Sequence, residues 1–312
     1  MYEVKEKEKS AKNKKGIIYI SDSGYFKVLC ISIESLREWH PDISVVVYDV
    51  GLSERQKTYL IESLSVRVIE WWPFFRDAPF RYNGLLQKIF AACLYPISIK
   101  KRLYIIENLV YNSLKQGTKP TAELITAQKP FVMLHAIDML ENHDILMMDA
   151  DTAVIGSLSE ILETRKIYKI LSREKHFSPR LTKGDCRAIY TGLVFIGGSK
   201  EEKKAFLHAW IKTMANNYEP MSEQTALTRL LQSCSMNKCH WRSGELISMQ
   251  LGENIVPLQL VECERYAAMD EKTREKRNSC IVHFKGWRHH DENFRRQCSE
   301  QGLAHYWEKI PE

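Results

Sequence analysis

Short apolar runs alternate with amphipathic segments over the first 71 residues. The apolar runs have the length of buried strands, and the segments between them repeat apolar residues at helical spacing. Ser53 stands before one such segment and is a suitable N-cap. Strands are predicted at 16–20, 43–50 and 66–71, and helices at 25–39 and 53–64. This alternation predicts βαβ units, and therefore an α/β fold with a mostly parallel central sheet flanked by helices.

The rest of the chain continues the pattern with longer interruptions. An aromatic loop and two helices are expected within 72–120, short strands and loops at 232–262, and an exposed charged segment at 264–276. Further strands are predicted at 145–148, 168–172, 189–198 and 281–284, and further helices within 121–140 and at 157–162, 201–216, 223–231 and 293–310. Because no repeat or Pro- and Gly-rich linker interrupts the chain, we expect one domain over 16–312 after a polar tail at 1–15.

Composition narrows the class of protein. With 312 residues, of which 44% are hydrophobic, the chain can bury a full core. Its net charge of +6 suits phosphorylated ligands or an anionic surface and does not by itself indicate nucleic acid. The eight cysteines lack the spacing of a disulfide framework and are expected to be free thiols. Cys234, Cys239 and His240 could form a zinc site only with a fourth ligand.

The N-terminal tail and the apolar content of the chain bear on where in the cell the protein lies. Residues 1–15 hold six lysines and three glutamates with almost no apolar content, so the simplest interpretation is a solvated arm. No apolar stretch approaches the roughly 20 residues that span a bilayer, and the first 16 residues lack the apolar core of a signal peptide. We therefore expect a cytoplasmic protein. The alternative is a weak electrostatic contact of the tail that places the protein peripherally at the inner membrane face.

Two carboxylates close the apolar run at 145–148. Asp149 and Asp151 are separated by one small residue, and in an extended chain residues two apart point to the same side. Hard oxygen ligands at the end of a strand suit Mn²⁺ or Mg²⁺ held against substrate phosphates. The alternative interpretation is a strand followed by a turn that the aspartates cap.

Other polar residues follow other predicted strands. Asp22 comes just after the first strand, and in a parallel sheet ligands bind beyond the carboxyl ends of the strands. His283 ends the last predicted strand and could complete a metal site, although a histidine in this position is often structural. Lys285, Gly286 and Arg288 offer cationic donors and close backbone approach to a diphosphate. This combination suits glycosyl transfer from a nucleotide sugar, where charge builds on a departing diphosphate.

At these positions the chain resembles the GT-A fold glycosyltransferases, and most closely those of glycosyltransferase family 8, which include bacterial lipopolysaccharide galactosyltransferases. Lys129-Pro130 also resembles a feature of capsule-type transferases. The matching segments are 17–64, Met148–Thr152 with its Asp-x-Asp motif, Thr191–Val194, Ser222–Gln224 and His283–Gly286.

The resemblance implies roles for particular residues. It implies a GT-A type fold and an Mn²⁺ or Mg²⁺ ion held by Asp149, Asp151 and His283. It places Asp22 at the uracil of a UDP-sugar and Ala150 at the ribose. The other residues assigned to the nucleotide sugar are Ser21, Lys129, Thr191, Gly192, Lys285, Gly286 and Arg288, with the lysine and glycine of the last motif at the diphosphate.

The catalytic pair implied by the resemblance is Gln224, which matches the glutamine beneath the anomeric carbon in retaining members, and Glu223 beside it. Retention of configuration is therefore predicted. An inverting reaction would need a carboxylate base, for which Glu223 is the candidate. A structural alternative makes the pair the first turn of a helix after Ser222, where a glutamate suits the helix dipole.

Two departures from the family pattern concern the donor. Tyr190-Thr191-Gly192 stands where the family often has Asn-x-Gly, which removes an expected sugar-contacting amide. His289 stands where a lysine is expected, so Lys285 or Arg288 would supply that charge.

The sequence thus predicts a metal-dependent hexosyltransferase of surface polysaccharide or glycoconjugate synthesis, with a nucleotide-sugar donor and a glycan or lipid-linked acceptor. The acceptor would contact mainly 72–118 and 232–290. One alternative is a sugar-1-phosphate nucleotidyltransferase, but Ile20–Gly24 is not the Gly-rich phosphate loop that this activity favours. The other is a non-catalytic protein that binds nucleotide sugars.

Overall fold

The computed structural model describes residues 14–71, 125–141, 143–163, 168–173, 188–215, 222–234, 244–267, 278–284 and 291–311. The strands are β1 (Lys14–Ser21), β2 (Ser44–Asp49), β3 (Arg67–Glu70), β4 (His143–Met148), β5 (Thr152–Val154), β6 (Tyr168–Arg173), β7 (Ala188–Ile196), β8 (Leu246–Leu251), β9 (Asn254–Glu262) and β10 (Ile281–His283). The helices are α1 (Phe26–Trp39), α2 (Glu54–Glu62), α7 (Lys129–Met139), α8 (Ser159–Leu162), α9 (Lys200–Ala215), α10 (Ser222–Cys234), α11 (Cys263–Tyr266), α13 (Asp291–Glu300) and α14 (Ala304–Trp307).

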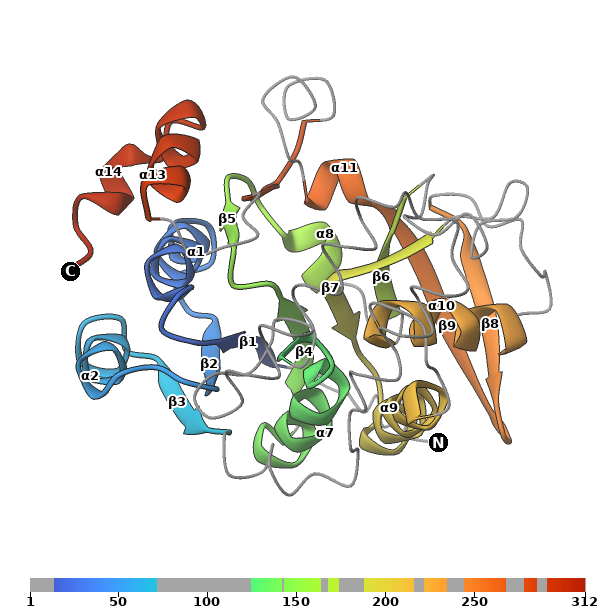
Figure 1. Ribbon diagram of the computed structural model, residues 1–312. Coiled ribbons are helices and arrows are strands. Elements are labelled where there is room, and N and C mark those ends of the chain that lie inside the picture. The colour runs from blue at the N-terminus through green and yellow to red at the C-terminus, as the bar shows by residue number, and fades with distance from the viewer. Residues whose placement is uncertain are drawn as a thin grey trace, which may run out of the picture.

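Eight strands form one mixed sheet in the order β3-β2-β1-β4-β7-β6-β9-β8 (Figure 1). The first four strands in this order are parallel to one another, as the alternating pattern predicted. Beyond them, β7 runs antiparallel to β4 and to β6, and β8 runs antiparallel to β9. The parallel half therefore carries the βαβ units of the N-terminal sequence.

Both faces of the sheet are buried, which explains why its central strands read as continuous apolar runs. In β1, Ile17 and Tyr19 face one core while Ile18 and Ile20 face the other. The first core is shared with α1, α8 and the C-terminal helices α13 and α14, and the second with α7, α9 and α10. The sheet thus forms the middle of three layers (Figure 1).

The strand order reverses at β1. From β1 the chain moves outward to β2 and β3, and it then returns to place β4 on the other side of β1. In open α/β sheets, ligands bind beyond the carboxyl ends of the strands at such a switch point. Asp22 follows β1 and Asp149 follows β4, so both carboxylates lie at this edge, as predicted.

A second, two-stranded sheet stands beyond this edge. The three-residue strands β5 and β10 pair antiparallel, with Thr152 opposite His283. Strand β5 was not predicted from the sequence. The expectation of an extended chain through Asp149–Asp151 was also wrong, because Ala150 and Asp151 form a turn that leads from β4 into β5.

Hydrogen bonds of buried hydroxyl groups connect this turn to α1. The Thr152 hydroxyl donates to the Asp149 carbonyl over 2.8 Å, and the Ser32 hydroxyl lies 3.0 Å from the Thr152 hydroxyl. The backbone N–H of Val154 donates to the Ser35 hydroxyl over 2.9 Å. Because each of these groups is buried, loss of a partner would leave an unsatisfied polar group at the end of β4.

Most predicted elements within the described residues are confirmed to within a few residues. Ser53 caps α2 through a capping box with Gln56, as predicted. The single closing helix predicted at 293–310 is instead two helices, α13 and α14, separated at Gly302, whose φ of +73° favours glycine. The predictions for the tail up to residue 13 and for 72–120 lie outside the described residues. No helix in the described part of the chain is both long and apolar enough to cross a bilayer.

Candidate functional site

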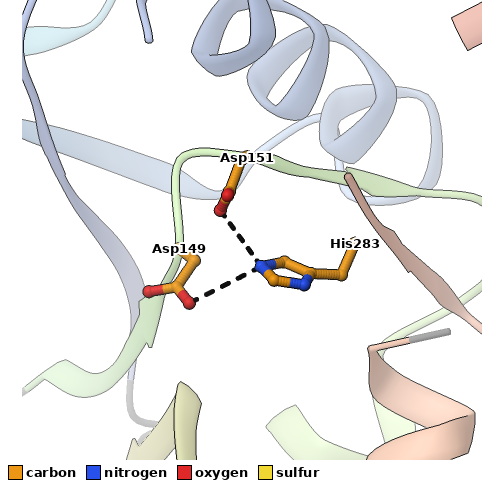
Figure 2. A group of neighbouring side chains, drawn as sticks. All are labelled: Asp149, Asp151 and His283. Carbon is orange, nitrogen blue, oxygen red and sulfur yellow. Dashed lines mark hydrogen bonds and ion pairs between the residues drawn. The ribbon is translucent and has the colours of Figure 1, made fainter. Parts of the chain in front are cut away.

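Three side chains meet at the switch-point edge. Each of Asp149, Asp151 and His283 places one ligand atom within 4.8 Å of the other two. Figure 2 shows the two carboxylates on the turn after β4, both directed toward the same nitrogen of the imidazole. His283 Nε2 lies 3.2 Å from Asp151 Oδ1 and 3.9 Å from Asp149 Oδ2. The predicted metal ligands are therefore brought together.

Backbone pairing holds the three residues in register. The N–H of Phe284 donates to the Asp151 carbonyl over 2.8 Å and continues the β5–β10 ladder across the site. The N–H of Asp149 donates to the Gly192 carbonyl over 3.0 Å and ties the turn to β7. The site is thus assembled from strands of two different sheets.

The donor set fits a small divalent cation. Two carboxylate oxygens and one imidazole nitrogen suit Mn²⁺ or Mg²⁺, and such ions usually complete their coordination with water and substrate phosphates. Asp149 presents its Oδ2 to the imidazole side, while its Oδ1 is engaged elsewhere. One oxygen of this carboxylate therefore remains directed toward the position a cation would take.

Burial and neighbouring charges have opposite effects on the pKa values of Asp151 and His283. Burial alone disfavours the ionised form of Asp151, but the charge of His283 and its hydrogen bond outweigh burial, so the pKa of this carboxyl lies below its usual value. Burial likewise disfavours charge on His283, but Asp151 and then Asp149 outweigh it and raise the pKa of the imidazole. Asp151 and His283 thus favour each other's charged forms.

Lys129 supplies a buried positive charge on the other side of Asp149. As the first residue of α7, with 4% of its surface exposed, it places Nζ 2.7 Å from Asp149 Oδ1. It also donates to the Thr191 carbonyl over 3.0 Å. Burial opposes its charge, but Asp149 and Glu223 raise the pKa of the ammonium above its usual value. Lys129 therefore remains a cation.

The hydrogen-bond network continues from β7 to the first turn of α10. The Thr191 hydroxyl donates to Glu223 Oε1 over 3.2 Å. Glu223 Oε2 is buried and has no hydrogen-bond partner in the described part of the chain, and burial raises the pKa of this carboxyl. Gln224, the next residue, is also buried. Glu223 and Gln224 therefore lie in the first turn of α10, as the structural alternative predicted, and both side chains are buried.

Gly192 allows β7 to approach the metal ligands. A Cβ atom there would lie 2.6 Å from Cε1 of Tyr190 and 2.9 Å from Oδ2 of Asp149. Both distances are shorter than side chains tolerate, so only glycine fits between the tyrosine ring and the carboxylate.

Three residues predicted for the nucleotide sugar lie at the same edge. Ser21 ends β1, and Ala150 lies buried in the turn after β4. Asp22 is buried and accepts hydrogen bonds through Oδ1 from the N–H groups of Gly24 and Tyr25, over 2.9 and 3.2 Å. In this structure Asp22 therefore fixes the start of α1.

Two tyrosines were missed as parts of the site. Burial first, and then the charges of Asp151, Asp22 and Asp149, raise the pKa of the half-buried Tyr25. The Tyr190 hydroxyl lies 3.0 Å from Nε2 of His283. For Tyr25 a signal existed, because it directly follows the turn after β1, whereas for Tyr190 no local pattern pointed to a histidine 93 residues away.

Lys285, Gly286, Arg288 and His289 lie outside the described residues. Cys239 and His240 of the zinc candidate lie outside them too, whereas Cys234 is a free thiol, as are the other described cysteines.

Known proteins resemble this chain in structure. No protein-family model and no curated protein matches its sequence. The structure of the bifunctional glycosyltransferase WbbM matches with a TM-score of 0.50 at 10% identity, over 95% of this chain and 52% of that one. This chain therefore spans about half the length of WbbM.

Two further structures match less closely. The galactosyltransferase LgtC, in complex with donor and acceptor sugar analogs, matches with a TM-score of 0.48 at 14% identity, over 95% of this chain and 98% of that one. A glycosyltransferase involved in glycosylation of the major capsid of PBCV-1 matches with a TM-score of 0.45 at 10% identity, over 91% and 98%. At such identities the WbbM likeness shows a shared fold: the chain has a GT-A-like α/β fold, as its sequence predicted.

Replacement of the buried lysine tests the charge network. Lys129→Met should lower the free energy of unfolding by about 3 kcal/mol at neutral pH, because a buried ion pair that loses one partner leaves an uncompensated charge. Without Lys129, the pKa of Glu223, already raised by burial, rises further. A group with a raised folded pKa loses stability as pH rises through that pKa, so the deficit should shrink toward pH 4.

Urea unfolding in EDTA at several pH values measures this effect. Lys200→Met, which removes an exposed lysine paired with Asp138, is the control and should cost much less. Lys129→Met combined with Glu223→Gln should be more stable than Lys129→Met alone at neutral pH. Equal deficits at all pH values, with no recovery in the double variant, would contradict the network.

Proposed function

We propose that this protein is a metal-dependent glycosyltransferase that moves a sugar from a nucleotide sugar, UDP-linked, to a hydroxyl acceptor. The observation that carries the proposal is the convergence of Asp149, Asp151 and His283 beyond the carboxyl end of β4. A cation site at the switch point of a GT-A-like sheet lies where a nucleotide binds in open α/β folds. The motif order of the sequence independently supports the same activity.

The nucleotide would lie along the carboxyl ends of β1 and β4. In the proposal Asp22 and Ser21 lie by the uracil and Ala150 by the ribose, and Lys285, Gly286 and Arg288 serve the diphosphate. The positions of Asp22 after β1 and of Ala150 after β4 support that order. The half-buried Tyr25, whose backbone N–H donates to Asp22, would offer an apolar ring surface beside the nucleotide.

A bound Mn²⁺ or Mg²⁺ ion would offset the negative charge that builds on the departing diphosphate. Asp149, Asp151 and His283 would hold it, with phosphate oxygens at the remaining positions. Lys129 keeps Asp149 in one orientation through its Oδ1 and adds a fixed positive charge within the site. Such preorganised charge stabilises a transition state without reorganisation at the moment of reaction.

The sugar would lie between Gly192 and the start of α10. The buried Glu223 Oε2, which has no hydrogen-bond partner in the described residues, supports a contact with a sugar hydroxyl. Thr191 and the field of Lys129 already engage Glu223, which favours binding over a role as base for inversion. We therefore place Gln224 beside the anomeric carbon and expect retention of configuration.

The acceptor and cellular setting belong to the same proposal. We propose a glycan or lipid-linked acceptor, transfer of a hexose, and a role in surface polysaccharide or glycoconjugate synthesis, without nucleic acid as a partner. The domain would span 16–312 of a cytoplasmic protein, and the lysine-rich tail would allow peripheral membrane contact.

Loss of one carboxylate tests the proposal. Asp151→Asn should abolish the rise in unfolding temperature that UDP and Mn²⁺ together give the wild type, because an amide replaces an anionic ligand. Its Mn²⁺-dependent hydrolysis of a panel of UDP-sugars should fall at least about tenfold. Asp42→Asn, an exposed aspartate just beyond α1, is the matched control and should behave as the wild type.

Other outcomes would contradict the proposal. Wild-type protein that binds no nucleotide sugar, or an Asp151→Asn variant that retains binding and turnover, would exclude it. Exchange of pyrophosphate into UTP would indicate a nucleotidyltransferase. Tight metal-dependent UDP binding without hydrolysis or transfer to any acceptor would indicate a non-catalytic binding protein.

The stereochemical course can be read from the product. Proton NMR of the sugar released from an α-linked UDP-sugar, recorded before mutarotation, should show the α-anomer first. Gln224→Ala should mainly lower kcat, since Gln224 is placed at the reacting carbon. Glu223→Gln should mainly raise KM, since Glu223 is placed at a sugar hydroxyl, and this rise should be smaller than the fall in kcat. A β-anomer as first product, with turnover lost only in Glu223→Gln, would support inversion instead.

A further inference from the structure

Thr152 is the residue through which the three proposed metal ligands are connected. Its hydroxyl donates to the Asp149 carbonyl over 2.8 Å and so closes the turn after β4. It follows Asp151 directly in the chain, and it pairs with His283 in the ladder between β5 and β10. A displacement of Thr152 would therefore change the spacing of all three ligand side chains at once.

The Thr152 hydroxyl is itself held by a serine of α1, the helix that packs against β5 (Figure 1). The Ser32 hydroxyl lies 3.0 Å from that of Thr152 and 3.0 Å from that of Tyr19 on β1. A hydroxyl has one proton and two lone pairs, so Ser32 can hold both neighbours at once. None of the three residues is more than 3% exposed, so the loss of one hydroxyl leaves an unpaired buried group beside it.

We propose that Ser32 is a positioning residue that sets the spacing of the three metal ligands by holding Thr152. The proposal rests on the metal site of the proposed function and concerns how that site is held. Hydrogen bonds fix a distance and a direction, which apolar contacts do less strictly. Ser32 thereby ties the ligand-bearing turn to α1 and β1, two elements of the central fold. Residues that support metal ligands in this way tune the affinity of the site.

Fixed ligand spacing affects which cation binds best. Mg²⁺, and Mn²⁺ of similar size, require near-ideal geometry with ligands at about 2.0–2.1 Å, whereas Ca²⁺ accepts about 2.3–2.6 Å and flexible sites. A turn held by the Ser32 hydroxyl therefore favours the smaller ions. Without that hydroxyl, the site should lose affinity for Mn²⁺ more than for Ca²⁺.

Removal of the serine hydroxyl tests the proposal. Ser32→Ala should raise the Kd for Mn²⁺ by about 3- to 30-fold in calorimetric titration, because the turn that carries the ligands loses a support. The Kd for Ca²⁺, measured in the same way, should rise much less, so the preference for the smaller ion should fall. Equal losses for the two ions would show that the ligand spacing is unchanged and would overturn the proposal.

Ser35→Ala is the matched control. Ser35 is a second fully buried serine of α1, and its hydroxyl accepts the N–H of Val154 over 2.9 Å, further along β5. In urea unfolding with EDTA, this variant should lose about as much stability as Ser32→Ala, since each change leaves a buried group unpaired. Its Kd for Mn²⁺ should nevertheless match that of the wild type.

A double-mutant cycle identifies the path. Thr152→Val keeps the shape of the side chain but removes the hydroxyl that joins Ser32 to the Asp149 carbonyl. Because Ser32 acts through that hydroxyl, Ser32→Ala should cause little further loss of Mn²⁺ affinity in the Thr152→Val background. Losses that multiply in the double variant would show that the two residues act independently, which the proposal excludes.

The outcomes separate this proposal from the proposed function. Wild-type protein that binds no divalent cation would contradict the proposed function itself, and this proposal with it. Tight binding by the wild type with an unchanged Kd in Ser32→Ala would overturn only the role of Ser32. Equal weakening of Mn²⁺ binding in Ser32→Ala and Ser35→Ala would also overturn that role, because the loss would then follow from reduced stability alone.

Discussion

Repulsion between two carboxylates held close together is the constraint on which this site depends. Asp149 and Asp151 stand on one tight turn, largely out of solvent, where like charges are costly. Lys129 faces one oxygen of Asp149, and His283 faces both carboxylates from the opposite side. These positive partners come from a helix and from a strand of a separate sheet, so the fold itself offsets the charge of the two carboxylates.

The contacts of Lys129 also link the proposed metal ligands to the proposed sugar contact. Lys129 contacts Asp149 and Thr191, and Thr191 in turn contacts Glu223 at the start of α10. A change of charge at any member is therefore felt by the others through a buried path of low dielectric. In the proposed reaction this path would help to hold the donor sugar and the departing diphosphate in one geometry, and such positioning lowers the barrier to reaction.

Sequence reasoning recovered what local pattern encodes. The strands β1, β2 and β4 were predictable because both faces of the sheet are buried and leave continuous apolar runs. Asp149, Asp151 and His283 were predictable as a group because each ends such a run. The turn at Ala150–Asp151 and strand β5 were not, since a three-residue strand paired with a partner over a hundred residues away has no periodicity to detect. The contacts of Lys129 with Asp149 and of Tyr190 with His283 likewise depend on tertiary packing alone.

The most direct test is a crystal structure with UDP and Mn²⁺, with anomalous data collected to locate the metal. We expect an anomalous peak within coordination distance of Asp149 Oδ2, Asp151 Oδ1 and His283 Nε2, with diphosphate oxygens completing the shell and the uracil toward the end of β1. A nucleotide bound away from the carboxyl ends of β1 and β4, or a saturated crystal without metal between these three side chains, would contradict the account.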